Sequence, residues 1–360
     1  GTMARYADSG HIVYATSDFT LMAAPFDLER LEARGPAVPL IEDVSVGVRS
    51  AAQFALSPTG DLAYAARYLG STAGVVRVAR TGVAEEIDPS WRAPIVSLAI
   101  SPDGTQLAVA IARGASGTGN PVMTAQDLWI KRLDRGPLSR LTFEGSANFR
   151  PSWTADGRSV TYGSNRGDAV FGVWMSRSDG TGTSVPLLAF DRPIYQATWS
   201  PDGRWLVGRL GLVAEADLFA IRPGEDSEPI VLATPFGERS PAVSPDGRWL
   251  AYDSNESDAR EVYVRPFPAL AEARCPVSAG GGRNPVWAHA GDELFYVSGA
   301  GEMVAAALEW RAAGCPVVRE NSLFSMEGYG DFSDHPAYAV TAADRRVIMI
   351  RRDLTGTPNA

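Results

Sequence analysis

Short apolar runs alternate with polar turn phrases along almost the whole chain. Trp249-Leu-Ala-Tyr252 and Leu294-Phe-Tyr-Val297 are typical runs, and neither continues with the 3.6-residue period of a helix. Short runs that end at Gly, Pro, Asp or Ser are typical of β-strands buried on both faces. The pattern therefore predicts an all-β fold.

The turns between these runs share one phrase, Ser-Pro-Asp-Gly, which satisfies the residue preferences of a type I turn and closes a hairpin. Gly203, Gly247 and Gly291 end successive copies at intervals of 44 residues, a spacing typical of propellers and solenoids. Counting degenerate forms, the phrase occurs eight times: Ala7–Gly10, Ser57–Gly60, Ser101–Gly104, Thr154–Gly157, Ser200–Gly203, Ser244–Gly247, Ala288–Gly291 and Thr341–Asp344.

Each repeat holds further apolar segments after the hairpin. Val262-Tyr-Val-Arg265 is a third segment, and Ile230-Val-Leu232 is a fourth. Four short antiparallel strands per repeat predict one blade of a β-propeller. The last repeat, Tyr338 to Ile350, has only two strands, so we expect eight repeat positions with the last one incomplete. Seven blades with an additional hairpin is the rival count.

A ring of repeats forms one domain by stacking many small interfaces, and we expect a single propeller domain over residues 1–360. The half-built last repeat leaves a strand edge without a partner in either count. Such an edge invites homodimerisation or pairing with further sequence.

Two stretches carry a family resemblance. Residues 244–252 (Ser-Pro-Asp-Gly-Arg-Trp-Leu-Ala-Tyr) and 254–268 resemble the TolB-like propeller repeat, and more narrowly the propeller that follows the membrane segment of many bacterial serine/threonine protein kinases. Residues 1–6 and 24–30 are similar to an internal stretch of that sensor region. The resemblance implies a non-catalytic sensor or scaffold that binds a protein or a ligand, in a periplasmic or other extracytoplasmic location.

Catalytic motifs of related proteins are missing from the sequence. The chain has no Gly-rich phosphate loop with a catalytic lysine, no His-Arg-Asp or Asp-Phe-Gly motif, and no Gly-x-Ser-x-Gly elbow. We therefore lean against an enzyme.

Charge and hydropathy exclude two classes of partner. The formal net charge of −9 and the pI near 5.0 argue against nucleic acid, which needs clustered positive charge. No apolar run approaches the roughly 18–20 residues of a membrane span, and no signal peptide opens the chain. The compartment stays open on these grounds alone.

The loops that enter the first strand of each repeat share an arginine. Guanidinium groups around one mouth of the channel favour a carboxylate, a phosphate or an acidic peptide. Acidic residues in five of these loops offer the alternative of ordinary surface ion pairs, which contribute little. The candidate ligand-binding residues are Arg49, Arg92, Arg150, Arg192, Arg239, Arg283 and Asn284.

One entry loop departs from this pattern and suggests a second class of function. Asp331, Asp334 and His335, with Asn148, could hold Ca²⁺ or another divalent cation in the channel. Asn284 and Gln196 are further donors. The alternative is therefore a metal-dependent hydrolase of the lactonase, esterase or phosphotriesterase type; otherwise no cofactor is expected.

Cysteine and tryptophan positions add two expectations. Cys275 and Cys315 begin fourth-strand segments of adjacent repeats, and we expect free thiols, too far apart to bridge. Trp153, Trp199 and Trp287 occupy matching first-strand positions, and we expect them layered near the axis.

Overall fold

The computed structural model describes strands and turns and, over the described residues, no helix. The chain divides by its contacts into two compact units, residues 1–71 with 113–124, and residues 72–112 with 125–360. A single domain over residues 1–360, as the sequence predicted, stays a prediction. The described residues are 2–15, 21–41, 54–56, 62–64, 72–112, 125–134, 136–143, 147–167, 170–211, 216–257, 259–272, 274–310, 314–330, 335–341 and 346–352.

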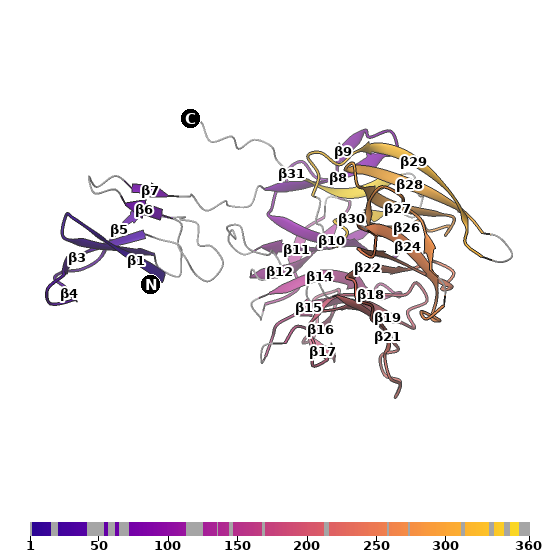
Figure 1. Cartoon of the computed structure of the whole chain (residues 1–360), viewed down its shortest axis with the longest axis horizontal. Helices are drawn as coiled ribbons and strands as arrows, with labels where there is room; N and C mark the ends of the chain where they lie inside the picture. The colour runs from indigo at the N-terminus through magenta and orange to yellow at the C-terminus, as the bar shows by residue number, and fades with distance from the viewer. Residues whose placement is uncertain are drawn as a thin grey trace. The chain divides into compact units, whose positions relative to one another are not determined.

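The larger unit is built from four-stranded antiparallel sheets, six of them within the described residues (Figure 1). Five sheets use four consecutive strands. The first three are β10 (Ile95–Ile100), β11 (Gln106–Ala112), β12 (Gln126–Arg132) and β13 (Leu138–Arg140); β14 (Asn148–Trp153), β15 (Ser159–Ser164), β16 (Gly172–Arg177) and β17 (Val185–Leu188); and β18 (Ile194–Trp199), β19 (Leu206–Leu210), β20 (Asp217–Ile221) and β21 (Ile230–Leu232). The other two are β22 (Glu238–Val243), β23 (Trp249–Ser254), β24 (Glu261–Pro266) and β25 (Cys275–Pro276); and β26 (Gly282–Trp287), β27 (Glu293–Ser298), β28 (Glu302–Glu309) and β29 (Val317–Ser325).

A sixth sheet closes the ring with strands from both ends of this unit. Its order is β30 (Tyr338–Val340), β31 (Arg346–Arg352), β8 (Ala73–Ala79) and β9 (Ala84–Glu86). The first strand of each sheet contacts the first strand of the next, and β30 contacts β10, so the sheets form a closed propeller.

The blade count differs from both predicted counts. The last repeat is not left half-built, because β31 pairs with β8 in the place that the sequence order gives to the second repeat's own hairpin. Neither eight positions nor seven blades describes this ring. The unpaired edge that motivated a homodimer is occupied in this sheet, and dimerisation stays a prediction.

The smaller unit holds the first repeat and the first half of the second. β1 (Thr2–Ala7), β2 (His11–Ala15), β3 (Leu21–Asp27), β4 (Glu32–Ala33) and β5 (Val38–Ile41) form one sheet, and β6 (Phe54–Leu56) pairs with β7 (Leu62–Tyr64) in another. Val13, Leu21 and Phe54 form its buried core. The two sheets of this unit therefore share one small core.

The turn phrase performs the role that its residues predict. In the copy at Ser244–Gly247, the Ser244 hydroxyl donates to Asp246 and accepts from the Trp249 N–H at 2.9 Å. Gly247 donates its N–H to the Ser244 carbonyl and has φ of 72°, a left-handed conformation that glycine adopts without strain. The phrase thus fixes this hairpin and the register of its two strands.

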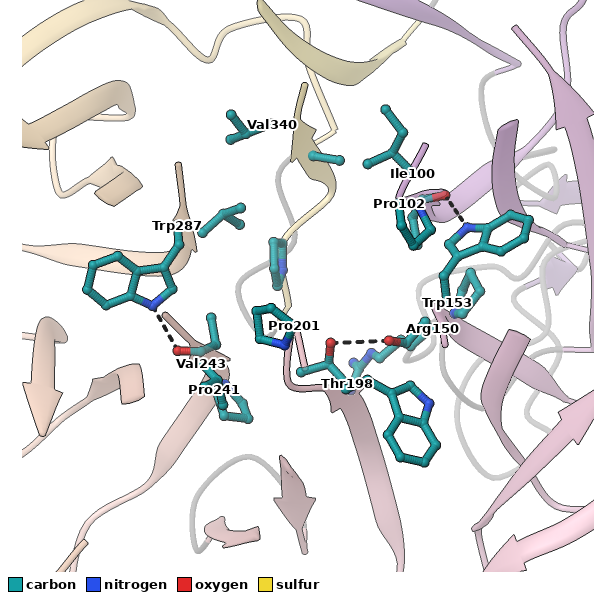
Figure 2. Close-up of a pocket in the computed structure, with 18 of the residues that line it drawn as sticks. Ile100, Pro102, Arg150, Trp153, Thr198, Pro201, Pro241, Val243, Trp287 and Val340 are labelled. Carbon is teal, nitrogen blue, oxygen red and sulfur yellow. Dashed lines mark hydrogen bonds between the residues drawn. The ribbon is translucent and has the colours of Figure 1, made fainter. Parts of the chain in front are cut away.

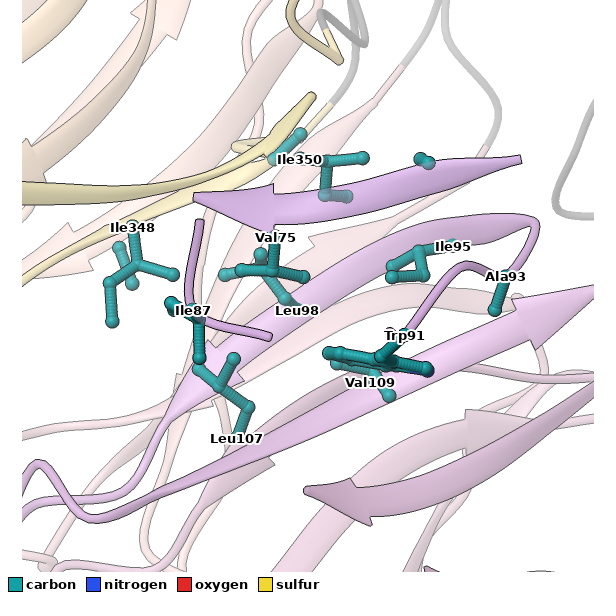
Figure 3. Close-up of a cluster of buried hydrophobic side chains, with 13 residues drawn as sticks. Val75, Ile87, Trp91, Ala93, Ile95, Leu98, Leu107, Val109, Ile348 and Ile350 are labelled. Atoms are coloured by element: carbon teal, nitrogen blue, oxygen red, sulfur yellow. The ribbon is translucent and has the colours of Figure 1, made fainter. Parts of the chain in front are cut away.

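The core lies between the blades. Val75, Ile348 and Ile350 of the closing sheet pack against Leu98 and Leu107 of the next sheet, with Trp91 at the edge of the cluster (Figure 3). Burial of such side chains removes both faces of each sheet from water. This explains why the strands read as continuous apolar runs.

The expectation of free cysteines is wrong. Cys275 in β25 and Cys315 form a disulfide, with their Cα atoms 5.3 Å apart. Cys315 lies just before β29 and reaches β25, the outer strand of the preceding blade. The sequence had placed the two cysteines on separate outer strands, too far apart to bridge. The bridge joins the outer parts of two neighbouring blades.

Candidate functional site

A central cavity of about 500 Å³ lies along the axis of the propeller (Figure 2). All six inner strands line it, namely β10, β14, β18, β22, β26 and β30, together with the prolines of three turn phrases. Inner strands line the channel as the repeat pattern predicts, because the first strand of each blade faces the axis. This cavity is the candidate site.

One side of the wall is mostly apolar, with the imidazoles of His289 and His335 beside its strands. The strands β22, β26 and β30 contribute backbone and side chains without charged groups, and we call this side the apolar half. Trp287 and Val243 lie on this side in Figure 2. The strand residues that line it are Pro241, Ala242, Val243, Pro285, Val286, Trp287, Tyr338, Ala339 and Val340.

The other side carries polar side chains. The strands β10, β14 and β18, which we call the polar half, contribute Ser97, Arg150, Ser152, Gln196 and Thr198. The Ser152 and Thr198 hydroxyls lie 3.2 Å apart and share a hydrogen bond between neighbouring blades. The Gln196 Oε1 atom is buried and has no hydrogen-bond partner among the described residues. A ligand in this cavity therefore meets an acceptor, hydroxyls and one positive charge on this side.

Three of the inner strands, β14, β22 and β26, contain a β-bulge at the cavity wall. Arg150, Ser240 and Asn284 have φ values of 50°, 53° and 58°, and each precedes a proline that lines the cavity. The pairing register of β14, β22 and β26 shifts at these positions. Bulges re-aim side chains near binding sites, and here they turn the Pro rings towards the axis.

The predicted tryptophan layer is confirmed in that Trp153, Trp199 and Trp287 all line the cavity. The Trp153 indole N–H donates to the Ala99 carbonyl at 3.1 Å, and the Trp287 indole N–H donates to the Ala242 carbonyl at 2.9 Å. Both acceptors belong to the preceding blade. These rings thus join adjacent blades while one face borders the cavity.

The predicted arginines do not gather at this cavity. Among those that the structure describes, Arg150 lines it and donates through Nη1 to the Tyr195 carbonyl at 2.6 Å. Arg92 forms an ion pair with Glu86 at 2.8 Å, and Arg192 pairs with Asp217.

The remaining candidates of this group are placed elsewhere or are not described. Arg239 is buried, and Arg283 donates to the Ser298 carbonyl at 3.3 Å. Asn284 is buried, and its backbone N–H donates to Asp253. Arg49 lies outside the described residues. An anion site made by the whole arginine set stays a prediction.

The structure describes two of the four predicted metal ligands, Asn148 and His335. Asn148 is fully buried and accepts from the Ser164 hydroxyl at 2.8 Å, so it serves the blade interior. His335 lines the cavity, with Nε2 3.3 Å from the Val96 carbonyl oxygen. Asp331 and Asp334 lie outside the described residues. Over the described part of the chain, no three His, Cys, Asp or Glu side chains cluster as metal ligands would.

Asp253 is a buried carboxyl group whose role was not predicted from the sequence. It accepts from Arg260 at 2.7 Å and from the Asn284 N–H at 3.1 Å, and so ties β23 to the inner strand of the next blade. Its complete burial raises the pKa of its carboxyl group above the usual value. The available signal was an acid at the end of the otherwise apolar run 249–254.

No helix of the described chain has the length and hydropathy to cross a membrane. Solved structures with this fold include a TolB-like protein of Agrobacterium tumefaciens, which matches 79% of this chain and 99% of its own with a TM-score of 0.58 at 15% identity. Hydrazine synthase of Kuenenia stuttgartiensis matches 88% of this chain and 98% of its own, with a TM-score of 0.51 at 14% identity. At these identities the likeness concerns the fold alone.

Sequence comparison gives a narrower assignment. An uncharacterized protein of Agrobacterium fabrum is 25% identical over 173 residues, which is 45% of this chain; the match spans 58% of the relative's length. The family model of the TolB beta propeller domain matches residues 53–291. Since that match covers more than half of the chain, this protein belongs to the TolB beta propeller family.

Proposed function

We propose that this chain is a non-catalytic binding propeller whose central cavity takes an amphipathic ligand. The observation that carries the proposal is the division of the cavity wall, with an apolar half on β22, β26 and β30 and a polar half on β10, β14 and β18. The ligand's apolar part lies against Trp287 and the prolines, and its acidic or hydrogen-bonding part faces Arg150 and Gln196.

Binding would be stabilised by burial of the ligand's apolar surface on one side of the cavity and by the positive charge of Arg150 on the other. Apolar surface contributes roughly 25 cal/mol for each Å² removed from water. A positive charge in a site of reduced water content favours an anion more strongly than the same charge at an open surface. Both effects act on a small aromatic acid and on an acidic segment of a partner protein with aromatic side chains.

We assign this binding to a sensor or scaffold in an extracytoplasmic compartment. The Cys275–Cys315 disulfide supports that compartment, because such bonds persist where the environment is oxidising. The resemblance of residues 244–268 to the sensor propeller of bacterial receptor kinases supports the sensor role.

Two fluorescent probes of similar shape test the proposal. 8-Anilinonaphthalene-1-sulfonate is apolar with one negative charge, and N-phenyl-1-naphthylamine is the uncharged counterpart. Both should bind with energy transfer from the cavity tryptophans, and the sulfonate should bind more tightly.

Two variants and one control localise the binding. Ala242→Phe adds a ring to the apolar half and should weaken both probes about ten-fold or more. Arg150→Met should weaken only the sulfonate. Val185→Phe, at an exposed position of β17, should change neither. Equal binding by wild type and Ala242→Phe, with both folded by circular dichroism, would refute the cavity as the site.

A further inference from the structure

Glu238 is a buried acid with only one of its two carboxyl oxygens satisfied. It is the first residue of β22 and is 1% exposed. Its Oε1 atom accepts hydrogen bonds from the Thr234 hydroxyl at 2.6 Å and from the Ser254 hydroxyl at 3.3 Å. Its Oε2 atom is buried and has no hydrogen-bond partner among the described residues. Such an atom is unusual, because a buried acceptor without a donor loses its hydration without compensation.

Glu238 lies at the joint between two blades. Its backbone N–H donates to the carbonyl of Ala216 in the preceding blade at 2.8 Å. Ala216 directly precedes Asp217, the first residue of β20. From Glu238, β22 continues to Ser240, which has φ of 53°, and to Pro241, which lines the cavity. One strand therefore connects this joint to the cavity wall.

The same joint in another pair of blades shows what Oε2 lacks. Asn148 begins β14 as Glu238 begins β22, and the two pair with Ser164 and Ser254 at equivalent positions. The Ser164 hydroxyl donates to the Asn148 Oδ1 atom at 2.8 Å, as Ser254 donates to Glu238. The Asn148 Nδ2 atom then donates across the joint to the Gln126 carbonyl at 3.3 Å. Where the asparagine has an N–H donor, the glutamate has an oxygen atom.

The acceptor across the joint is also equivalent in the two places. Ala216 is the counterpart of Gln126, because each directly precedes the aspartate of the third strand, Asp217 or Asp127. By this equivalence, a side chain that closes the joint from position 238 needs a donor for a backbone carbonyl. A carboxylate has acceptors only, whereas a protonated carboxyl group carries one O–H donor.

We infer that Glu238 is a proton-dependent joint between the blade of β18–β21 and the blade of β22–β25. With a proton on Oε2, the side chain donates across the joint as Asn148 does in its own blade. Without the proton, a negative charge stays buried without a donor for Oε2, and the joint loosens. This device belongs to the fold and does not depend on what the cavity binds.

The surroundings favour the protonated form. Burial raises the pKa of the Glu238 carboxyl group above its usual value, against the effect of its two hydroxyl donors. Of the surrounding charges, that of Asp217 has the largest effect on this pKa, and it also raises it. The other charged or titratable groups on strands that contact β22, on β22 itself or on the adjoining loops are Arg192, Tyr195, Arg209, Arg239, Tyr252, Asp253, Arg260 and Arg283.

Glu238→Gln tests the inference, because glutamine has nearly the same shape and carries an N–H donor that does not ionise. An acid with a raised folded pKa stabilises the fold fully below its unfolded pKa of about 4.3, and this contribution is lost as pH rises through the folded pKa. Between about pH 4 and about pH 8, the unfolding constant of wild type, divided by that of the variant, should therefore rise at least about ten-fold in urea denaturation, the equivalent of about one pKa unit.

Glu327→Gln is the matched control, because Glu327 is exposed and the same ratio should stay constant over this pH range. A constant ratio for Glu238→Gln would overturn the inference. An NMR titration of the Glu238 carboxyl carbon in wild type needs no substitution. It should titrate above about 4.3, and a titration at or below this value would overturn the inference as well.

Asp217→Asn tests the electrostatic coupling across the joint. Asp217 forms an ion pair with Arg192, and loss of its negative charge lowers the pKa of Glu238. In the background of Asp217→Asn, the rise produced by comparison with Glu238→Gln should therefore move to lower pH. A rise at the same pH as in the wild-type background would count against a joint that these two acids share.

Discussion

The two halves of the cavity wall share one backbone plan and differ in their side chains. In the apolar half, the Trp287 indole N–H and the Tyr338 hydroxyl donate to backbone carbonyls of neighbouring strands. The carbon atoms of these side chains are therefore left to line the cavity. In the polar half, Thr198 and Gln196 keep oxygen atoms at the wall. Repeats with the same strand arrangement can therefore line a channel with two chemically different sides. We expect substitutions in the apolar half to act mainly on stability and those in the polar half mainly on ligand selection.

Trp287→Ala should produce the largest change, because the apolar half is also blade core. Trp287 is 7% exposed and packs with Leu294 and Val304. We expect the free energy of unfolding to fall by about 3–5 kcal/mol in urea denaturation. Val83→Ala, at a residue 69% exposed, is the control and should change it by less than about 0.5 kcal/mol. A loss below about 1 kcal/mol at Trp287 would show that this half is not core.

Removal of the disulfide should have the second-largest effect on the free energy of unfolding and should leave probe binding unchanged. Cys275→Ser with Cys315→Ser opens a bridge across 40 residues and should cost about 2–4 kcal/mol. Neither cysteine lines the cavity, so probe affinity should stay unchanged. Reductant should lower the melting temperature of the wild type and leave that of the double variant unaltered; a shift in both would contradict the bond's role.

Asp253→Ala should destabilise the apolar half indirectly, through the inner strand that Asp253 holds. Arg260, 17% exposed at its side chain, would lose its carboxylate partner, and the Asn284 N–H would lose its acceptor. We expect a loss of about 2–3 kcal/mol in thermal or urea unfolding. Arg319→Ala breaks an exposed pair with Glu309 and should cost less than about 1 kcal/mol. Similar losses in the two variants would argue against a structural role for the buried charge.

A pH series tests the support of β10, the first strand of the polar half. Lys131 donates to Asp88 at 2.7 Å and, as the largest cause, lowers the pKa of that carboxyl group to about 2. A lowered pKa stabilises the folded state above the unfolded value near 3.9, and this stabilisation is lost as pH falls from about 4 to about 2. Lys131→Met should therefore be less stable than wild type at pH 6, and the gap should shrink towards pH 2. A constant gap would mean that the pair is not linked to folding.

Ser152→Ala with Thr198→Val should give the smallest effect. The pair contributes one shared hydrogen bond at 3.2 Å, worth about 0.5–1.5 kcal/mol. Urea denaturation measures this loss, and the difference in affinity between the sulfonate and the uncharged probe should decrease. Equal loss of both probes would mean that these hydroxyls shape the cavity and do not select the ligand.

The sequence predicted the parts of the fold that local residues determine. Ser244, Asp246 and Gly247 define a turn by their own chemistry, and the runs beside it define two strands. The closure could not be predicted in the same way, because neither Val347 nor Val78 carries a local signal that identifies the other as its partner. That choice depends on packing between segments far apart in the chain.

The site shows the same limit. The tryptophans of the inner strands could be predicted, because residues at matching positions of each repeat point to the same side of their strands. Arg92 and Arg192 form ion pairs with Glu86 of β9 and Asp217 of β20, and the sequence does not show which acidic residue each arginine meets. The disulfide was missed because Cys275 and Cys315 are 40 residues apart in the sequence, and their Cα separation of 5.3 Å depends on the packing of two neighbouring blades.

The closing sheet has a consequence for biosynthesis. Arg346 and Glu85, which meet in that sheet, are 261 residues apart, whereas β7 leaves the ribosome just before β8. Local contacts form early and long-range pairing waits for synthesis to finish. The nascent propeller must therefore keep the edge of β8 available until the final hairpin has been translated.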